Sequence, residues 1–240
     1  MIPSDRHLQI GSLLFEGVDQ IDLTGPFEVM SRLPNSTYKI YARTLEPIRD
    51  VRGLRLLADA TLSQAPQLDV IHVPGGVGQE DLMDDAEVLD WIARQARGAH
   101  ALFSVCTGAL LCGAAGLLIG RRATTHWASF HLLPLFGATP VNHRVVVDGE
   151  WVFAAGVTAG IDGALMLAAN LRGAEVARTI QLNVAYAPEP PFVGGTPETT
   201  PKAILDQARN SFRQLTERRE RTARRVAARL GVTASAAPPF

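Results

Sequence analysis

The stretch that decides the fold is residues 101–127, ALFSVCTGALLCGAAGLLIGRRATTHW. It opens with an apolar run, Ala101–Val105, which predicts a buried strand, and continues after Cys106 with a helical pattern over Thr107–Ala115. A cysteine at this junction, followed by Thr107 and Gly108, has the layout of a nucleophile elbow with cysteine in place of serine. The turn should lift the side chain clear of the sheet, and the helix N-terminus should lower the thiol pKa.

The alternative for Cys106 is that it is a small buried hydrophobe, the commonest role of a free cysteine. Cys112 fits that description, because it lies mid-helix among Leu110, Leu111 and Ala114. The strand–Cys–Thr–Gly–helix context favours a reactive role for Cys106. Two cysteines six positions apart fit neither a disulfide framework nor a zinc site, so no metal is expected.

Outward from this stretch, short apolar runs alternate with longer amphipathic segments. The predicted strands are Leu8–Phe15, Tyr38–Thr44 and Asp69–Val73, and the predicted helices are Leu23–Arg32, Glu80–Arg97, Asp162–Leu171 and Ala174–Val184. Arg144–Val147 and Trp151–Ala155 flank an Asp148-Gly149 pair, which predicts a hairpin. This alternation indicates an α/β protein whose mostly parallel sheet is covered on both faces.

Three polar or glycine-rich turns, Asp19–Asp22, Gly75–Gly78 and Cys106–Gly108, follow predicted strands. Ligands of parallel sheets bind beyond the carboxyl ends of the strands. We therefore expect these three turns to meet and to form the site.

Composition narrows the class of protein. The 240 residues contain 23 Lys and Arg against 24 Asp and Glu, so no overall field points to nucleic acid or to a membrane surface. No apolar run reaches the roughly 18 residues of a membrane helix, and the N-terminus lacks a signal-peptide layout. These features predict a cytoplasmic protein with no membrane or nucleic-acid partner.

The last part of the chain has a different pattern. Tyr186–Pro201 contains five prolines and predicts an irregular arm, and Lys202–Leu230 follows as a helix with nine basic and three acidic residues. We expect this helix to pack on the body or on a dimer partner through Ile204, Phe212, Leu215 and Val226, with its arginines solvated. The alternative is a DNA-binding helix. The predicted domain limits are 1–200 for the α/β domain, 201–231 for the helix and 232–240 for a flexible tail.

The quoted motif, with VPGG at 73–76 and QIDLTGPFEV at 20–29, resembles the ThiJ/PfpI superfamily, of class I glutamine amidotransferase-like fold. The resemblance covers residues 8–190. Within the superfamily the chain is most similar to the isonitrile hydratase branch, on the segments QIDLTGP, TTHW, VTAGID at 157–162 and APEPPF at 187–192. The resemblance implies a flavodoxin-like three-layer sandwich with a C-terminal helical extension, and a homodimer.

The resemblance also implies roles for individual residues. Asp22 would be a carboxyl that shuttles a proton to and from Cys106, with Asp19 as the fallback; the alternative for Asp22 is a helix N-cap. His126 would line the pocket with Trp127, a direct base role being the lesser possibility. Backbone N–H groups of Gly75, Gly76 and Thr107 would form an anion hole, and the Thr107 hydroxyl would contact substrate.

The implied activity is hydration of an isonitrile to an N-substituted formamide through a cysteine thioimidate, with no metal or organic cofactor. Two alternatives stay open. One is a glyoxalase-type or amidase-like enzyme acting on carbonyl compounds. The other is a ligand-sensing module related to the sensor domains of AraC-type regulators, although only about 40 residues follow Pro201 where two helix-turn-helix units need about 100.

Overall fold

A central seven-stranded sheet organises the molecule, in the order β10-β11-β7-β6-β1-β2-β5. The computed structural model describes residues 2–233, so most of the predicted flexible tail lies outside the described residues. The strands are β1 Leu8–Leu13, β2 Ser36–Ala42, β5 Ala60–Thr61, β6 Val70–Val73, β7 Ala101–Val105, β10 Val145–Asp148 and β11 Trp151–Ala154. Every neighbouring pair is parallel except β10–β11, the predicted hairpin.

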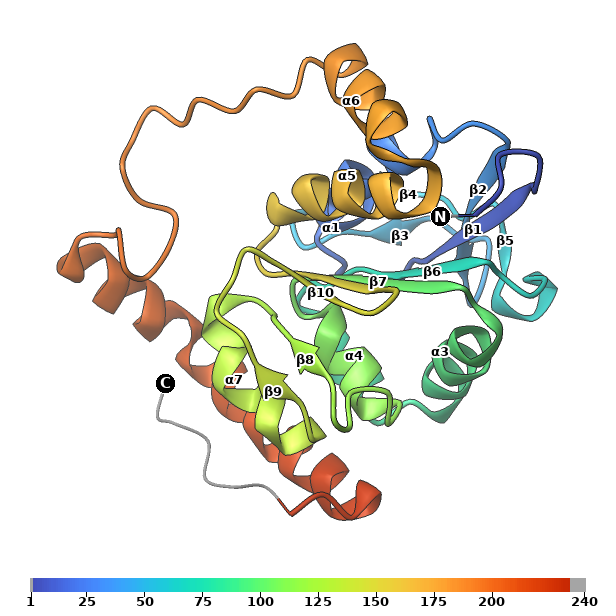
Figure 1. The fold of residues 1–240 in the computed structure, drawn as a ribbon. Coiled ribbons are helices and arrows are strands. Elements are labelled where there is room, and N and C mark those ends of the chain that lie inside the picture. The colour runs from blue at the N-terminus through green and yellow to red at the C-terminus, as the bar shows by residue number, and fades with distance from the viewer. Residues whose placement is uncertain (1, 234–240) are drawn as a thin grey trace.

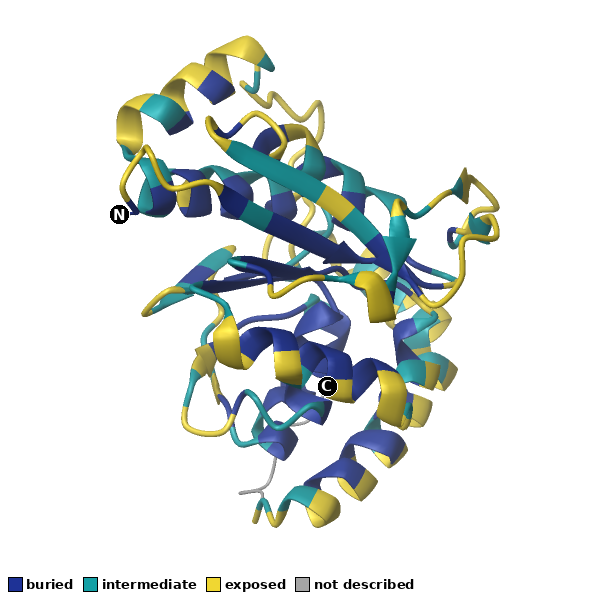
Figure 2. Ribbon diagram, turned by 90° about the vertical axis from the view of Figure 1, so that its right-hand side faces the viewer, coloured by how far each residue is buried: buried dark blue, intermediate teal, exposed yellow. Residues whose placement is uncertain are grey.

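Helices cover both faces of this sheet (Figure 1). One face carries α1 Gln20–Met30, α5 Ala159–Arg172 and α6 Ala174–Asn183; the other carries α3 Ala86–Gly98, α4 Gly108–Ala114, the 3₁₀ segment η2 Trp127–Phe136 and α7 Lys202–Leu230. A separate hydrophobic core fills each interface between sheet and helices. Figure 2 shows the resulting pattern, in which buried residues line the strands and the inward faces of the helices. The predicted three-layer α/β sandwich is confirmed.

Three predicted helices have clearly different limits. The helix predicted over Asp162–Leu171 begins three residues earlier, at Ala159, and a capping aspartate explains the other two. The helix predicted from Leu23 begins at Gln20, because Asp19 is its N-cap and accepts a hydrogen bond from Ile21 N at 3.2 Å. The single helix predicted over Glu80–Arg97 is two helices, α2 Gln79–Leu82 and α3. Asp85 starts α3 by accepting from Val88 N, and this cap interrupts the apolar periodicity.

Several short elements were not predicted from the sequence. These are the two-residue strands β3 Ile48–Arg49, β4 Arg55–Leu56, β5, β8 Arg122–Ala123 and β9 Thr139–Pro140, and the 3₁₀ segments η1 Leu62–Gln64 and η2. Two residues are too few to show an alternating pattern, so pairing partners elsewhere in the chain determine these strands.

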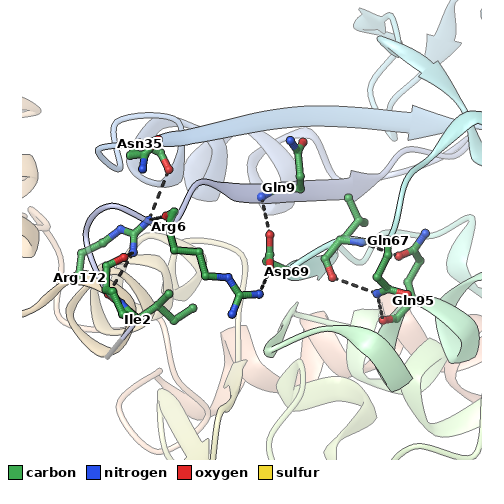
Figure 3. Close-up of polar contacts among 10 residues, drawn as sticks. Ile2, Arg6, Gln9, Asn35, Gln67, Asp69, Gln95 and Arg172 are labelled. Carbon is green, nitrogen blue, oxygen red and sulfur yellow. Dashed lines mark hydrogen bonds and ion pairs between the residues drawn. The ribbon is translucent and has the colours of Figure 1, made fainter.

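Polar contacts fasten the sheet at the edge remote from the predicted site (Figure 3). Asp69 accepts from the backbone N of Gln9 at 2.8 Å and pairs with Arg6 at 2.7 Å, which joins the starts of β1 and β6. Arg172, at the end of α5, donates to the carbonyl oxygens of Ile2, Pro3 and Arg6. These contacts fix the N-terminal segment and leave the carboxyl edge for the site.

The arm and α7 complete the fold. The segment after α6, orange in Figure 1, passes outside the body and leads into α7, which lies beside η2. Ala223, Val226 and Ala227 of α7 enter the core under the sheet. Phe212 and Leu215 are half-buried, but Ile204, which was predicted to pack, is 57% exposed because the first turns of α7 extend beyond the body. Within residues 2–233, no helix is both long and apolar enough to span a bilayer.

Candidate active site

Cys106 occupies a sharp turn between β7 and α4. Its φ of +55° lies in the left-handed region, where a non-glycine residue is strained. Two hydrogen bonds hold the conformation: Cys106 N donates to the Ala154 carbonyl at 2.9 Å, and Thr125 Oγ1 donates to the Cys106 carbonyl at 2.7 Å. The start of α4, directly after this turn, needs glycine at position 108, since a Cβ on Gly108 would lie 2.0 Å from the Val73 carbonyl oxygen.

The three turns predicted to meet are in direct contact. Asp19 N donates to the Gly75 carbonyl at 2.9 Å, and Gly75 N donates to Asp22 Oδ2 at 3.0 Å. Gly76 N donates to Thr107 Oγ1 at 3.2 Å. Gly76 has a φ of +140°, and a Cβ on it would lie 2.4 Å from the Gly17 carbonyl oxygen, so only glycine fits this crossing.

Asp22 lies in the first turn of α1, fully buried and facing Cys106. It is not the N-cap, since Asp19 has that role, so the capping alternative for Asp22 is wrong. Burial, and next the charge of Asp19, raise the pKa of the Asp22 carboxyl to about 8, against smaller opposing effects of the Cys106 thiol and the Gly75 N–H. At neutral pH the carboxyl is therefore mostly protonated and is a proton donor.

The Cys106 thiol departs from the prediction in one respect. The helix N-terminus was expected to lower its pKa, but burial, and next the nearby Asp22 charge, raise the pKa well above the usual value. The Thr107 N–H and the guanidinium of Arg219 act in the opposite direction. Ionisation of either Cys106 or Asp22 therefore disfavours ionisation of the other, because two negative charges so close together are unfavourable.

The predicted anion-hole groups lie at this junction with their donors engaged. Gly75 N–H and Gly76 N–H donate to Asp22 and Thr107 respectively, while the Thr107 N–H is directed to the Cys106 sulfur. The Thr107 hydroxyl is buried between the two turns and also lies 3.3 Å from the Gly76 carbonyl oxygen. Because the two glycine donors are engaged elsewhere, the anion hole stays a prediction.

His126 and Trp127 lie at the start of η2. His126 is its N-cap, with Nδ1 accepting from Ala128 N at 3.3 Å. Burial, and next the charge of Arg219, lower the pKa of His126 to about 4, so its ring is neutral at physiological pH. Both rings lie against Phe212 of α7, with centroids 5.7 Å apart in each case. A lowered pKa and an Nδ1 engaged at the cap argue against His126 as a base, and its role in lining the pocket with Trp127 stays a prediction.

Arg219 is a site residue that the sequence analysis missed. It was grouped with the solvated arginines of α7, but it is only 4% exposed and donates to the Gly76 carbonyl at 3.0 Å. A signal was present in the sequence, because Arg219 falls within the apolar stripe formed by Leu215, Ala223 and Val226. Residues 2–233 contain no cluster of three or more His, Cys, Asp or Glu side chains that could hold a metal.

Comparison with known proteins places this site in a family. The DJ-1/PfpI family model matches residues 9–170. The isonitrile hydratase of Pseudomonas putida is 48% identical over 225 residues, which cover 94% of this chain and 99% of that protein. A ThiJ/PfpI family protein from Pseudomonas syringae has a similar structure, with a TM-score of 0.89 and 36% identity over 92% of this chain and 93% of the other.

A regulator also shares part of the sequence. The HTH-type transcriptional regulator GbdR of Pseudomonas aeruginosa is 29% identical over 194 residues, which are 77% of this chain but only 52% of the regulator. The match of the family model and the near full-length similarity to the Pseudomonas proteins agree with the fold and the resemblance found in the sequence. The chain belongs to the DJ-1/PfpI family.

Proposed function

We propose that this protein is an isonitrile hydratase, converting an isonitrile and water into an N-substituted formamide. The observation that carries the proposal is the fully buried Asp22 carboxyl that faces the thiol of Cys106, and burial raises the pKa of this carboxyl to about 8. The 48% identity to an isonitrile hydratase along nearly the whole chain supports it. A reactive free thiol also agrees with a reducing, cytoplasmic location.

The first half of the reaction uses the form of the site in which Cys106 is a thiolate and Asp22 an acid, which is a minor form at neutral pH because the thiol pKa is raised. The terminal carbon of an isonitrile is unhindered and electrophilic, so the Cys106 sulfur forms a bond to it. Asp22 donates its proton to that carbon, and the product is a thioimidate, R–N=CH–S–Cys106. Asp22 is left as a carboxylate in an apolar setting, where it is a strong base.

The second half uses the same carboxyl in reverse. Asp22 accepts a proton from water, the hydroxide adds to the thioimidate carbon, and Asp22 passes that proton on to the nitrogen. The tetrahedral intermediate then expels the thiolate, its hydroxyl proton returns to Asp22, and R–NH–CHO is released. The Gly75 N–H orients the Asp22 carboxyl for these transfers, and the Thr107 hydroxyl is the predicted contact to the intermediate. Nucleophile and proton carrier both come from the chain, so the scheme needs no cofactor.

The decisive experiment compares Cys106→Ala with Cys112→Ala. Purified wild-type protein should convert cyclohexyl isocyanide into N-cyclohexylformamide, measured by chromatography, and should act more slowly on methylglyoxal. Cys106→Ala should lose turnover, because no other nucleophile stands at the turn. Cys112→Ala should retain it, since Cys112 is buried in α4 with its thiol pKa raised to about 12 by burial. Comparable hydration by wild type and Cys106→Ala would overturn the mechanism. Preference for methylglyoxal would instead favour a carbonyl-directed enzyme.

A further inference from the structure

The C-terminal helix carries a buried cation in its apolar stripe. Arg219 of α7 is 4% exposed and lies one turn before Ala223 and two turns before Val226, both in the core. Its neighbours Arg218 and Arg225 instead point outward and pair with Asp81 and Asp84 near α2. Arg219 is therefore buried, unlike Arg218 and Arg225, although the sequence analysis expected all the arginines of α7 to be solvated.

Within the described part of the chain, only neutral groups hydrogen-bond to this guanidinium. It donates to the Gly76 carbonyl at 3.0 Å and to Ser129 Oγ at 3.3 Å, and its Nε has no partner among the described residues. Throughout residues 2–233, no carboxylate lies within ion-pair distance of it. Glu80 instead accepts from Thr222 at 2.7 Å and lies 3.7 Å from Arg218. Burial of a charged group without a counterion is costly, so an unpaired guanidinium here needs an explanation.

Two groups that are negative when ionised face this guanidinium, the Cys106 sulfur and, with a smaller effect, Glu80. Gly76 connects Arg219 with the cysteine turn, because its carbonyl accepts from Arg219 while its N–H donates to Thr107, the neighbour of Cys106. The interaction of Arg219 with Cys106 lowers the thiol pKa and raises that of the guanidinium. The other charges near the sulfur, Asp22 and Asp19 of α1, act in the opposite direction. His126 is neutral, and Glu80 faces Arg219 from α2.

We propose that Arg219 is a positioning residue of the active site, whose guanidinium neutralises the Cys106 thiolate and fixes the Gly75–Gly76 turn beside it. Arginine suits this role because it stays charged when buried. The C-terminal helix is then part of the site as well as a support for the core. The inference rests on the proposed function in assigning reactivity to the same cysteine, but its test requires no isonitrile.

The test measures the ionisation of Cys106 in Cys112→Ala protein, where Cys106 is the remaining thiol. The rate of iodoacetamide alkylation and the thiolate absorbance at 240 nm are followed from pH 6 to pH 12, because the thiol pKa lies well above its usual value. Arg219→Met, which keeps the bulk but removes the charge, should raise the midpoint by about one pH unit or more, so alkylation at pH 7 falls about tenfold. Arg219→Lys should restore most of the rate. Arg225→Met, which removes a surface cation of the same helix, should leave the midpoint unchanged.

The same midpoint in wild type and Arg219→Met would overturn the proposal, as would equal effects of Arg219→Met and Arg225→Met. Should Arg219→Met not fold, the comparison of Arg219→Lys and Arg219→Gln with wild type decides by the same measurement, with melting temperatures to confirm folding. Absence of isonitrile turnover in wild type would count against the proposed function alone. A raised midpoint in Arg219→Met would still support the role of Arg219.

Discussion

At the scale of the residue, Asp22 is the side chain on which the proposed chemistry depends most. Its carboxyl has the raised pKa of a buried acid, and it accepts from Gly75 N–H through one oxygen while Cys106 faces it. Asp19, three residues earlier, caps α1 and is half-buried. Because Asp19 caps the helix and Asp22 faces the thiol, the two neighbouring aspartates are a matched pair for mutation.

Asp22→Asn should reduce the rate of isonitrile hydration by about a hundredfold or more, since the amide keeps the shape but transfers no proton. Asp19→Asn should retain most of the activity, because asparagine also caps helices. The measurement is kcat with cyclohexyl isocyanide at pH 7. Near-normal turnover in Asp22→Asn, together with loss in Asp19→Asn or His126→Ala, would assign the proton transfer to a different residue.

Asp22→Asn, which should lower the activity, should make the fold more stable than that of the wild type as the pH rises. Folding raises the pKa of Asp22 from about 4 to about 8, so the folded state holds a proton that the unfolded state releases between these values. The stability that protonated Asp22 contributes is present below pH 4 and is lost as the pH rises to 8. The asparagine of Asp22→Asn does not titrate, so the variant does not lose this stability as the pH rises. The difference in unfolding free energy between Asp22→Asn and wild type should grow by roughly 1 kcal/mol per pH unit from pH 5 to pH 8 and then level off, measured by urea denaturation. A constant difference would contradict the buried, protonated state.

At the scale of the element, α7 has two parts with different surroundings. Val226 is 1% exposed in the core under the sheet, whereas Ile204 at the start of the helix is 57% exposed. The second half therefore stabilises the body and also brings Arg219 to the site, while the first half is anchored on one side by Phe212 against His126 and Trp127.

Val226→Ser should lower the melting temperature by several degrees, since it leaves a small cavity and a buried hydroxyl. Ile204→Ser should change it by no more than about a degree, because the side chain loses little contact. Thermal unfolding followed by circular dichroism measures both. Truncation after Thr200 should be more severe and should also reduce turnover, because it removes Arg219. An equal effect of the two serine variants would contradict the packing of α7 described above.

At the scale of the whole molecule, the charges of α7 argue against a nucleic-acid partner, and the exposed apolar side chains favour a second copy of the chain. Four basic side chains of α7 form ion pairs with described residues: Lys202 with Asp206, Arg218 with Asp81, Arg224 with Glu220 and Arg225 with Asp84. This pairing gives little reason for phosphate binding. The most exposed large apolar side chains, Leu182, Phe192 and Val193, all lie at the end of α6 and on the arm.

We expect the protein to be a homodimer that covers these side chains, because apolar groups gathered on an extended segment favour burial against a partner. Light scattering should give about twice the 25.8 kDa of one chain. Phe192→Ser with Val193→Ser should weaken the dimer without lowering the stability of the body, since both residues are more than 80% exposed. A monomeric wild type, or a dimer that the double variant leaves intact at low concentration, would contradict this assignment.

The sequence by itself determined the layers of the fold and the meeting of the three turns that form the candidate site. Strands such as β7 are continuous apolar runs because both faces of a parallel sheet are buried, and this pattern can be read locally. The turns at the carboxyl ends, with Cys106, Thr107 and the Gly75-Gly76 pair, could be predicted to meet because parallel strands end at one edge. Cys106 and its strand–turn–helix context need only a few consecutive residues to be recognised.

The tertiary structure decided the electrostatics of the site. Whether Asp22 caps a helix or faces a thiol depends on where Asp19 and Gly75 lie, and its raised pKa follows from burial that no local pattern reports. Arg219 lies 113 positions beyond Cys106 in the sequence. It reaches the site only because the end of α7 packs on η2 and under the sheet. Hydrophobic periodicity is a local property of the chain, whereas a pKa depends on all the charges and solvent around a group, and folding alone brings those together.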